Sequence, residues 1–233
     1  GNLLTSTIGR KLIMSVSGLF LVLFLLFHMS MNLAAVFSTE AYNAICEFLG
    51  ANWYALAGTL ILAAGVVVHL VYATVLTLHN RSSRGSQRYA MTAEPEGVTW
   101  ASRNMYVLGI IIVLGLLLHL YNFWYNMQFA EIIGNHELGP FPPADGAAYI
   151  AALFSSPVYC IIYLVWFAAI WFHLTHGFWS AFHTIGWDNQ TWLPRLKRIA
   201  NVVATIVFLC FALVVIVFYL RSLGVCGGSC AGF

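Results

Sequence analysis

The sequence predicts an all-α integral membrane protein, a bundle of five transmembrane helices, and three observations support this fold class. Hydrophobic residues make up 61% of the chain, charged residues only 8%, and the mean hydropathy is +0.84. A soluble domain carries about 25% charged residues, so this chain cannot be solvated on all sides. Five apolar runs are each long enough to cross a hydrocarbon core of about 30 Å as a helix. The sequence lacks the alternating pattern of β-barrel strands, and open strands cannot span lipid.

Each predicted span begins at residues that suit a membrane interface. The spans cover, in order, residues 12–36, 53–79, 104–128, 157–183 and 199–220. The first follows Arg10 and Lys11; it is too long for a signal peptide, and no A-x-A-like cleavage site follows it. The second and fourth begin at Trp53 and Pro157, and the third and fifth follow basic residues. We expect one transmembrane domain covering residues 1–233.

The basic residues predict the orientation of this bundle. Arg221 falls at one end of the predicted spans, and the other nine Lys and Arg residues fall at the opposite end: Arg10, Lys11, Arg81, Arg84, Arg88, Arg103, Arg195, Lys197 and Arg198. The segments on the Arg221 side, residues 37–52 and 129–156, hold five acidic residues and no Lys or Arg. Because cytoplasmic loops carry the excess of basic residues, we expect a cytoplasmic N-terminus and an outer C-terminus.

Four of the spans carry a histidine well inside the lipid zone, namely His28, His69, His119 and His173. Each lies 16 or 17 residues beyond the point where its helix enters. At 1.5 Å per residue, each is about 24–26 Å along its helix. Since the helices alternate in direction, His28 and His119 lie towards the outer face, and His69 and His173 lie towards the cytoplasm. The two levels are expected to be about 10 Å apart.

Two imidazoles at one depth on different helices suit the two axial positions of a haem iron. Ligation through one ring nitrogen also leaves the other N–H free to donate to a neighbour. One helical turn from three of the four histidines lies a glycine, which leaves a bare patch where a flat macrocycle could pack: Gly65, Gly115 or Gly177. His28 breaks this pattern, because Phe24 and Asn32 occupy the corresponding positions. The spacing therefore predicts a bundle that encloses two haems.

A single histidine in such a span is more often a core imidazole hydrogen-bonded to another helix. Four histidines, one per helix and paired by depth, favour the haem interpretation. A transporter or proton relay usually adds acidic partners or broken helices, and no Asp or Glu lies inside any predicted span. His176 lies one turn from His173 on nearly the same face, so the spacing alone leaves either residue as the fourth ligand.

The remaining histidines and the cysteine pair are given simpler roles. His79 and His183 lie near the cytoplasmic interface, where we expect solvated ring edges; contact with a haem propionate or a quinone is the minority interpretation. His136 lies in an outer segment and is expected to be solvated. Cys226 and Cys230 lie in the outer tail, where a disulfide would be permitted, but they lack the C-x-x-C-H pattern of covalent haem attachment. Free or locally paired thiols are the expectation.

Over nearly its whole length, the chain resembles the single-chain, five-helix, dihaem cytochrome b membrane anchors of succinate:quinone oxidoreductases and quinol:fumarate reductases. The resemblance rests on SVSGLFLVLFLLFHMSMNL (15–33), SRNMYVLGIIIVLGLLLHL (102–120) and PVYCIIYLVWFAAIWFHLTHGFWSAFHTIGW (157–187). It implies that the fourth-span ligand is His173, four residues before a glycine, and not His176. It also implies an inner haem b on His69 and His173 and an outer haem b on the other pair, His28 and His119.

The resemblance further implies an electron-transfer subunit of succinate dehydrogenase or fumarate reductase in a bacterial cytoplasmic membrane. The implied partners are a flavoprotein and an iron–sulfur subunit on the cytoplasmic face, a quinone (menaquinone is expected) and the lipid bilayer, with no nucleic acid. No residue of this chain is expected to be catalytic. Arg103 is a candidate partner for a haem propionate, with interfacial anchoring as an equal alternative. Two other interpretations are a cytochrome b subunit of a hydrogenase or formate dehydrogenase, and a haem-free membrane transporter.

One position departs from the pattern of these relatives. Those with a proposed transmembrane proton path carry a glutamate two residues before the fourth ligand, and here Trp171 occupies that place. The resemblance therefore does not imply such a path in this chain. Glu40 and Glu47 lie in the outer segment where these relatives have a quinone-site carboxylate.

Overall fold

The computed structural model describes residues 6–83, 99–187 and 189–225, and every regular element within these ranges is a helix. Five of the helical segments are long and apolar enough to cross a membrane, which confirms the predicted fold class as far as the helices are concerned. They are α1 (Thr7–Phe37), α3 (Trp53–Ser83), α5 (Met105–His119) with its continuation to Ile132, α8 (Pro157–Thr184) and α9 (Trp192–Ser222).

Two of these helices begin several residues before the predicted spans. Helix α1 starts at Thr7, where the Ser6 hydroxyl caps it by accepting a hydrogen bond from the Gly9 N–H (3.1 Å). Helix α9 starts at Trp192, although the apolar run begins only at Ile199. The hydropathy pattern marks the extent of the apolar run, whereas the helical hydrogen bonds of the backbone already begin in the residues that precede it. Helix ends and membrane boundaries therefore differ in this chain.

Short helices that the sequence did not predict join the spans. They are α2 (Thr39–Phe48), α4 (Trp100–Arg103), α6 (Ala130–Ile132) and α7 (Gly146–Phe154). Helices α2 and α7 are joined through Asn43, whose amide donates to the Asp145 carboxylate (2.8 Å) and accepts from the Ala147 N–H (2.9 Å). The Asp145 carboxylate also caps α7 by accepting from the Ala148 N–H (3.1 Å). These contacts join two connecting segments that are far apart in the sequence.

A π-helical segment, η1 (Leu120–Phe129), follows directly after His119 and was not predicted either. Its last turn is tied to the connection between α2 and α3. The Gln128 amide donates to the Gly50 carbonyl (2.9 Å) and accepts from the Thr59 hydroxyl (2.9 Å). One turn later, the Glu131 carboxylate accepts from the Ala51 N–H (2.7 Å).

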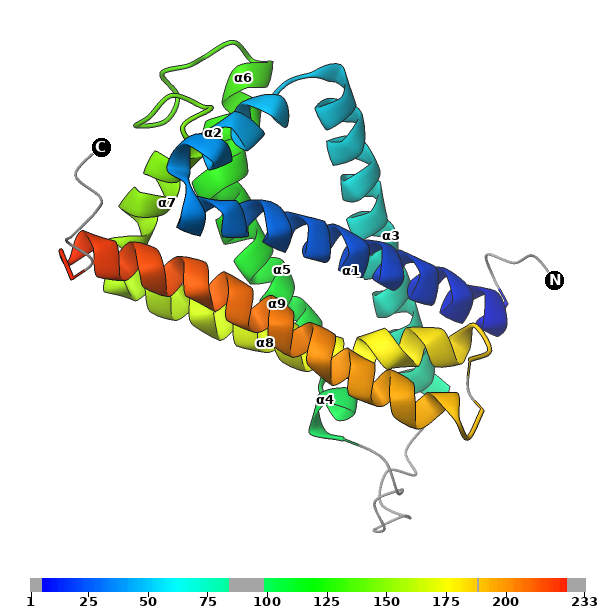
Figure 1. The fold of residues 1–233 in the computed structure, drawn as a ribbon. Coiled ribbons are helices and arrows are strands. Elements are labelled where there is room, and N and C mark those ends of the chain that lie inside the picture. The colour runs from blue at the N-terminus through cyan, green and yellow to red at the C-terminus, as the bar shows by residue number, and fades with distance from the viewer. Residues whose placement is uncertain (1–5, 84–98, 188, 226–233) are drawn as a thin grey trace.

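Helices α8 and α9 lie side by side along their length, and α1 packs against both of them and against α3 (Figure 1). Helix α5 packs on α8, whereas α3 is supported mainly by α1, and none of the α3 side chains that the structure describes is buried. Helices α2, α6 and α7 gather at the end where α1 and α9 finish, and the described N-terminal end of α1 lies at the other end. Four helices, α1, α3, α5 and α8, thus surround the interior where the predicted histidines lie.

Candidate functional site

The structure brings the four predicted histidines together as two pairs, and each pair joins two different helices. The rings of His28 on α1 and His119 on α5 have centroids 5.7 Å apart and planes at 86°. The rings of His69 on α3 and His173 on α8 have centroids 6.3 Å apart and planes at 71°. These are the pairs that counting depth along the helices gives. Since His173 and not His176 faces His69, the structure favours His173 as its partner.

The spacing of the rings fits a metal bound between them. Two imidazoles on opposite sides of one metal have centroids about 6 Å apart, because each metal–nitrogen bond is about 2 Å and each nitrogen lies about 1 Å from its ring centre. Both measured separations, 5.7 and 6.3 Å, are close to this distance. Two rings in direct edge-to-face contact also have centroids about 4.5–7 Å apart. The donor atoms, in addition to the spacing, therefore distinguish a metal site from a simple ring contact.

One nitrogen atom in each of two of these rings lacks a partner. His119 Nδ1 and His173 Nδ1 are both buried, and neither has a hydrogen-bond partner within the described part of the chain. A buried polar atom left unpaired costs about 1–3 kcal/mol. Haem iron is commonly bound by histidine nitrogen, and its porphyrin supplies the four equatorial ligands that two imidazoles do not. The imidazole donors therefore fit haem, and in each pair one ring has a buried Nδ1 without a hydrogen-bond partner among the described residues.

Helix α1 contributes two residues to the inner pair that the sequence analysis missed. The Ser17 hydroxyl lies 3.3 Å from His69 Nδ1. A Cβ atom on Gly18 would lie 3.2 Å from His69 Cε1, so this glycine permits the ring to approach the helix closely. Ser17 lies eleven residues before His28 on the same helix, which places it about 16 Å away, towards the inner level. The same count of depth, applied to hydroxyl residues as well as histidines, would have found it.

The outer pair is connected to helix α2 by hydrogen bonds. The Asn32 amide donates to the His28 carbonyl (2.8 Å), and its nitrogen lies 3.4 Å from His28 Nε2. The Tyr42 hydroxyl on α2 donates to the Asn32 carbonyl oxygen (3.1 Å). Asn32 is one of the two residues that interrupt the glycine pattern beside His28.

The patches beside two of the predicted glycines are not bare in the structure. A Cβ on Gly65 would lie 2.6 Å from the Phe20 ring, and a Cβ on Gly115 would collide with the indole of Trp166. Aromatic side chains from α1 and α8 thus cross to these glycines and fill the space beside them. Gly177 is more open, because a Cβ at this position would lie 3.5 Å from the Met105 methyl group. Haem packing against Gly65 and Gly115 stays a prediction, and it requires Phe20 and Trp166 to move.

The other residues named from the sequence are not members of the two pairs. His176 has a buried Nδ1 without a partner among the described residues, and its ring contacts Trp179 at a centroid distance of 5.1 Å. The Trp171 indole donates to the Thr205 hydroxyl of α9 (3.0 Å). Four residues are exposed: His79, Arg103, His136 and His183. Four others named from the sequence lie outside the described residues: Arg84, Arg88, Cys226 and Cys230.

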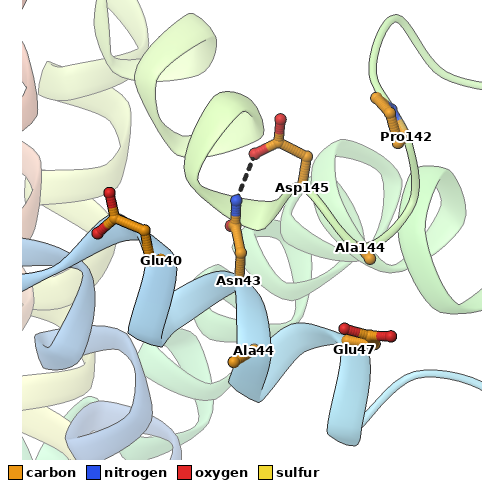
Figure 2. Close-up of a pocket in the computed structure, with 7 residues that line it drawn as sticks. All are labelled: Glu40, Asn43, Ala44, Glu47, Pro142, Ala144 and Asp145. Carbon is orange, nitrogen blue, oxygen red and sulfur yellow. Dashed lines mark hydrogen bonds between the residues drawn. The ribbon is translucent and has the colours of Figure 1, made fainter. Parts of the chain in front are cut away.

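A shallow acidic pocket lies at the end of the molecule formed by α2 and α7. Figure 2 shows Glu40 and Glu47 on α2, with Asp145 facing them across the pocket and bonded to Asn43. A backbone hydrogen bond and the Ser38 hydroxyl lower the pKa of Glu40. Burial raises the pKa of the nearby Cys46 thiol to about 11. This pocket is separate from the imidazole pairs, and its carboxylates carry the acidic character predicted for this end.

The site is thus two pairs of imidazoles inside an apolar bundle, with polar contacts from α1 beside each pair. Comparison of the chain with protein-family models, curated proteins and solved structures finds no match. The chemical capacity of the site is that of imidazole rings from different helices that face each other in two pairs. Nitrogen donors of this kind are suitable ligands for a metal macrocycle.

Proposed function

We propose that this chain is the membrane anchor and electron-transfer subunit of a succinate:quinone oxidoreductase or quinol:fumarate reductase, with two b haems. The observation that carries the proposal is the pairing of four intramembrane imidazoles across helices, at centroid separations of 5.7 and 6.3 Å. The resemblance of three segments to dihaem cytochrome b anchors supports the choice of complex. When bound, each haem supplies a one-electron carrier.

The residues of the chain determine how such a group is held. His69 and His173 would hold the inner haem, and His28 and His119 would hold the outer haem. Because two imidazoles would bind each iron, oxygen would find no open coordination site. In the membrane, lipid and the apolar helices around the pairs would exclude water. The chain therefore favours electron transfer over activation of a substrate.

The charged residues support an orientation and a docking face for the partners. The basic residues at the described N-terminal end of α1 and at the start of α9 support a cytoplasmic location for that end. The flavoprotein and iron–sulfur subunits would dock there, and the chain would exchange electrons with a quinone, expected to be menaquinone. Moving one charge across the membrane involves about 2.3 kcal/mol per 100 mV. The side on which quinone binds therefore determines whether turnover consumes or generates the membrane potential.

The absorption spectrum of the purified chain tests this proposal. We expect two haems per chain and a sharp α-band on reduction, typical of six-coordinate b haem. A colourless protein would contradict the proposal and favour a haem-free transporter. A haem-containing protein that co-purifies with the iron–sulfur subunit of a hydrogenase or formate dehydrogenase would retain the haem sites but overturn the assignment to a succinate or fumarate enzyme.

A further inference from the structure

The hydrogen bonds of Ser17 determine which nitrogen of His69 carries the hydrogen. Ser17 is buried on α1, and its hydroxyl donates to the Met14 carbonyl (3.0 Å). A serine hydroxyl has one hydrogen, and a carbonyl oxygen can only accept. With its hydrogen on the Met14 carbonyl, the Ser17 oxygen acts as the acceptor at its second contact, 3.3 Å from His69 Nδ1. In this arrangement His69 Nδ1 carries the ring hydrogen.

The protonation of Nδ1 leaves the lone pair of the ring on Nε2. In a neutral imidazole, one nitrogen donates a hydrogen bond and the other accepts one or binds a metal. The His69 ring faces His173 across the interior at 6.3 Å, and Gly18 allows the ring to lie against α1 in this position. The contact with Ser17 thus selects one ring tautomer and one orientation.

We propose that Ser17 is a positioning residue of the inner site, which holds His69 in the form whose Nε2 can bind a metal. By accepting the Nδ1 hydrogen, Ser17 also makes His69 a stronger electron donor to that metal. This inference rests on the proposed function. It is specific to one site, since His28 in the outer pair is contacted by Asn32 and lies eleven residues further along α1.

The test is a redox titration of both haems in the purified full chain and its Ser17 variants. In Ser17→Ala, the acceptor for the Nδ1 hydrogen is lost, so His69 stabilises ferric iron less. We expect the midpoint potential of one haem to rise, namely the haem that His69→Ala removes, while the other haem keeps its potential. Ser17→Thr retains the hydroxyl and is expected to restore the wild-type potential. Low-temperature EPR of the ferric protein should show a change in one low-spin signal only.

Ser30→Ala is the matched control, because the Ser30 hydroxyl also donates to a carbonyl of α1 (Leu26, 2.8 Å) but contacts no described imidazole. It is expected to leave both potentials unchanged. Wild-type potentials for both haems in Ser17→Ala, or equal shifts in both, would overturn the inference while the proposed function stands. If the Ser17→Ala chain binds no haem, haem binding by the Ser17→Thr chain supports the inference. Failure of Ser17→Thr to restore haem binding overturns the inference. A wild-type chain without haem would instead overturn the proposed function itself.

Discussion

At the scale of single residues, polar groups of the bundle interior obtain their hydrogen bonds from α1. Ser17 contacts His69, and Asn32 contacts His28. An unsatisfied polar group in a lipid environment costs several kcal/mol, so these contacts lower the cost of burying two of the four imidazoles. His119 and His173 retain unpaired Nδ1 atoms within the described part of the chain. We infer that these two residues gain most from a bound ligand.

Cys46 on α2 provides a residue-scale test of the packing between α2 and α7. Burial raises the pKa of its thiol to about 11, and the thiolate is the reactive form of cysteine. At pH 8, we expect Cys46 to be alkylated about 100-fold more slowly than an exposed thiol of pKa about 8.5. The rate should rise with pH until the pH reaches about 11. Peptide mass spectrometry after timed exposure to iodoacetamide measures this rate.

The matched control is Glu137→Cys, which places an exposed thiol in the connection between α6 and α7. Equal rates at the two positions at pH 8 would show that Cys46 is not packed as described. The same variant reports orientation, because a membrane-impermeant maleimide should label residue 137 in intact cells. Labelling that occurs only after the membrane is broken would contradict an outer location for this end.

At the scale of helices, hydropathy predicted the spans because lipid imposes a simple requirement on each of them. A spanning helix needs about 20 apolar residues, and a run of this length can be recognised from the local sequence alone. The short helix α7 depends on Asn43, which is 102 residues away from Asp145, so local patterns could not predict its docking. The π-helical segment after His119 likewise ends in the contact of Gln128 with Gly50, and Glu131 of the following helix α6 contacts Ala51; both partners are distant in sequence.

The candidate site was predictable in part for a similar reason. Depth along a helix follows from counting residues, so the sequence could indicate which histidines lie at the same level. The direction in which a side chain points around its helix depends on how neighbouring helices pack. Counting could therefore not show that Phe20 covers Gly65 or that Trp166 covers Gly115. The contact of Tyr42 with Asn32 also depends on how α2 folds back onto α1.

Two glycines in the spans give an element-scale prediction. A methyl group on Gly115 would collide with the Trp166 indole, which is itself held by a hydrogen bond to the Ile112 carbonyl (3.0 Å). We expect Gly115→Ala to lower the free energy of unfolding by about 1–3 kcal/mol, the usual cost of overpacking. Denaturation in detergent, followed by circular dichroism, measures this change.

The matched control is Gly58→Ala in α3, where nothing lies within 4 Å of the added methyl group. Because alanine favours the helix over glycine by up to about 1 kcal/mol, Gly58→Ala should be neutral or stabilising. Equal destabilisation by both substitutions would show that the α5–α8 contact is not as tight as the structure indicates.

At the scale of the whole molecule, charge and hydrogen bonding distinguish its two ends. At the acidic end, the Arg221 guanidinium donates to the Val36 carbonyl (2.8 Å) and lies 3.5 Å from the Ala35 carbonyl. It thus satisfies carbonyls at the C-terminus of α1, where a positive charge is favourable. At the other end, the Lys197 ammonium lies over the Trp179 ring at 4.7 Å. Under the proposed function, the basic residues at that end would form the surface that meets the partner subunits.

The central claim is that imidazoles from opposite helices share one iron at each of two levels. Replacement of each histidine by alanine in turn, followed by haem quantification and reduced spectra, tests this claim most directly. His69→Ala and His173→Ala should each lose the same haem and retain the other, and His28→Ala and His119→Ala should each lose the second haem. Loss of different haems by the two partners of one pair, or retention of both haems in any of the four variants, would contradict the account.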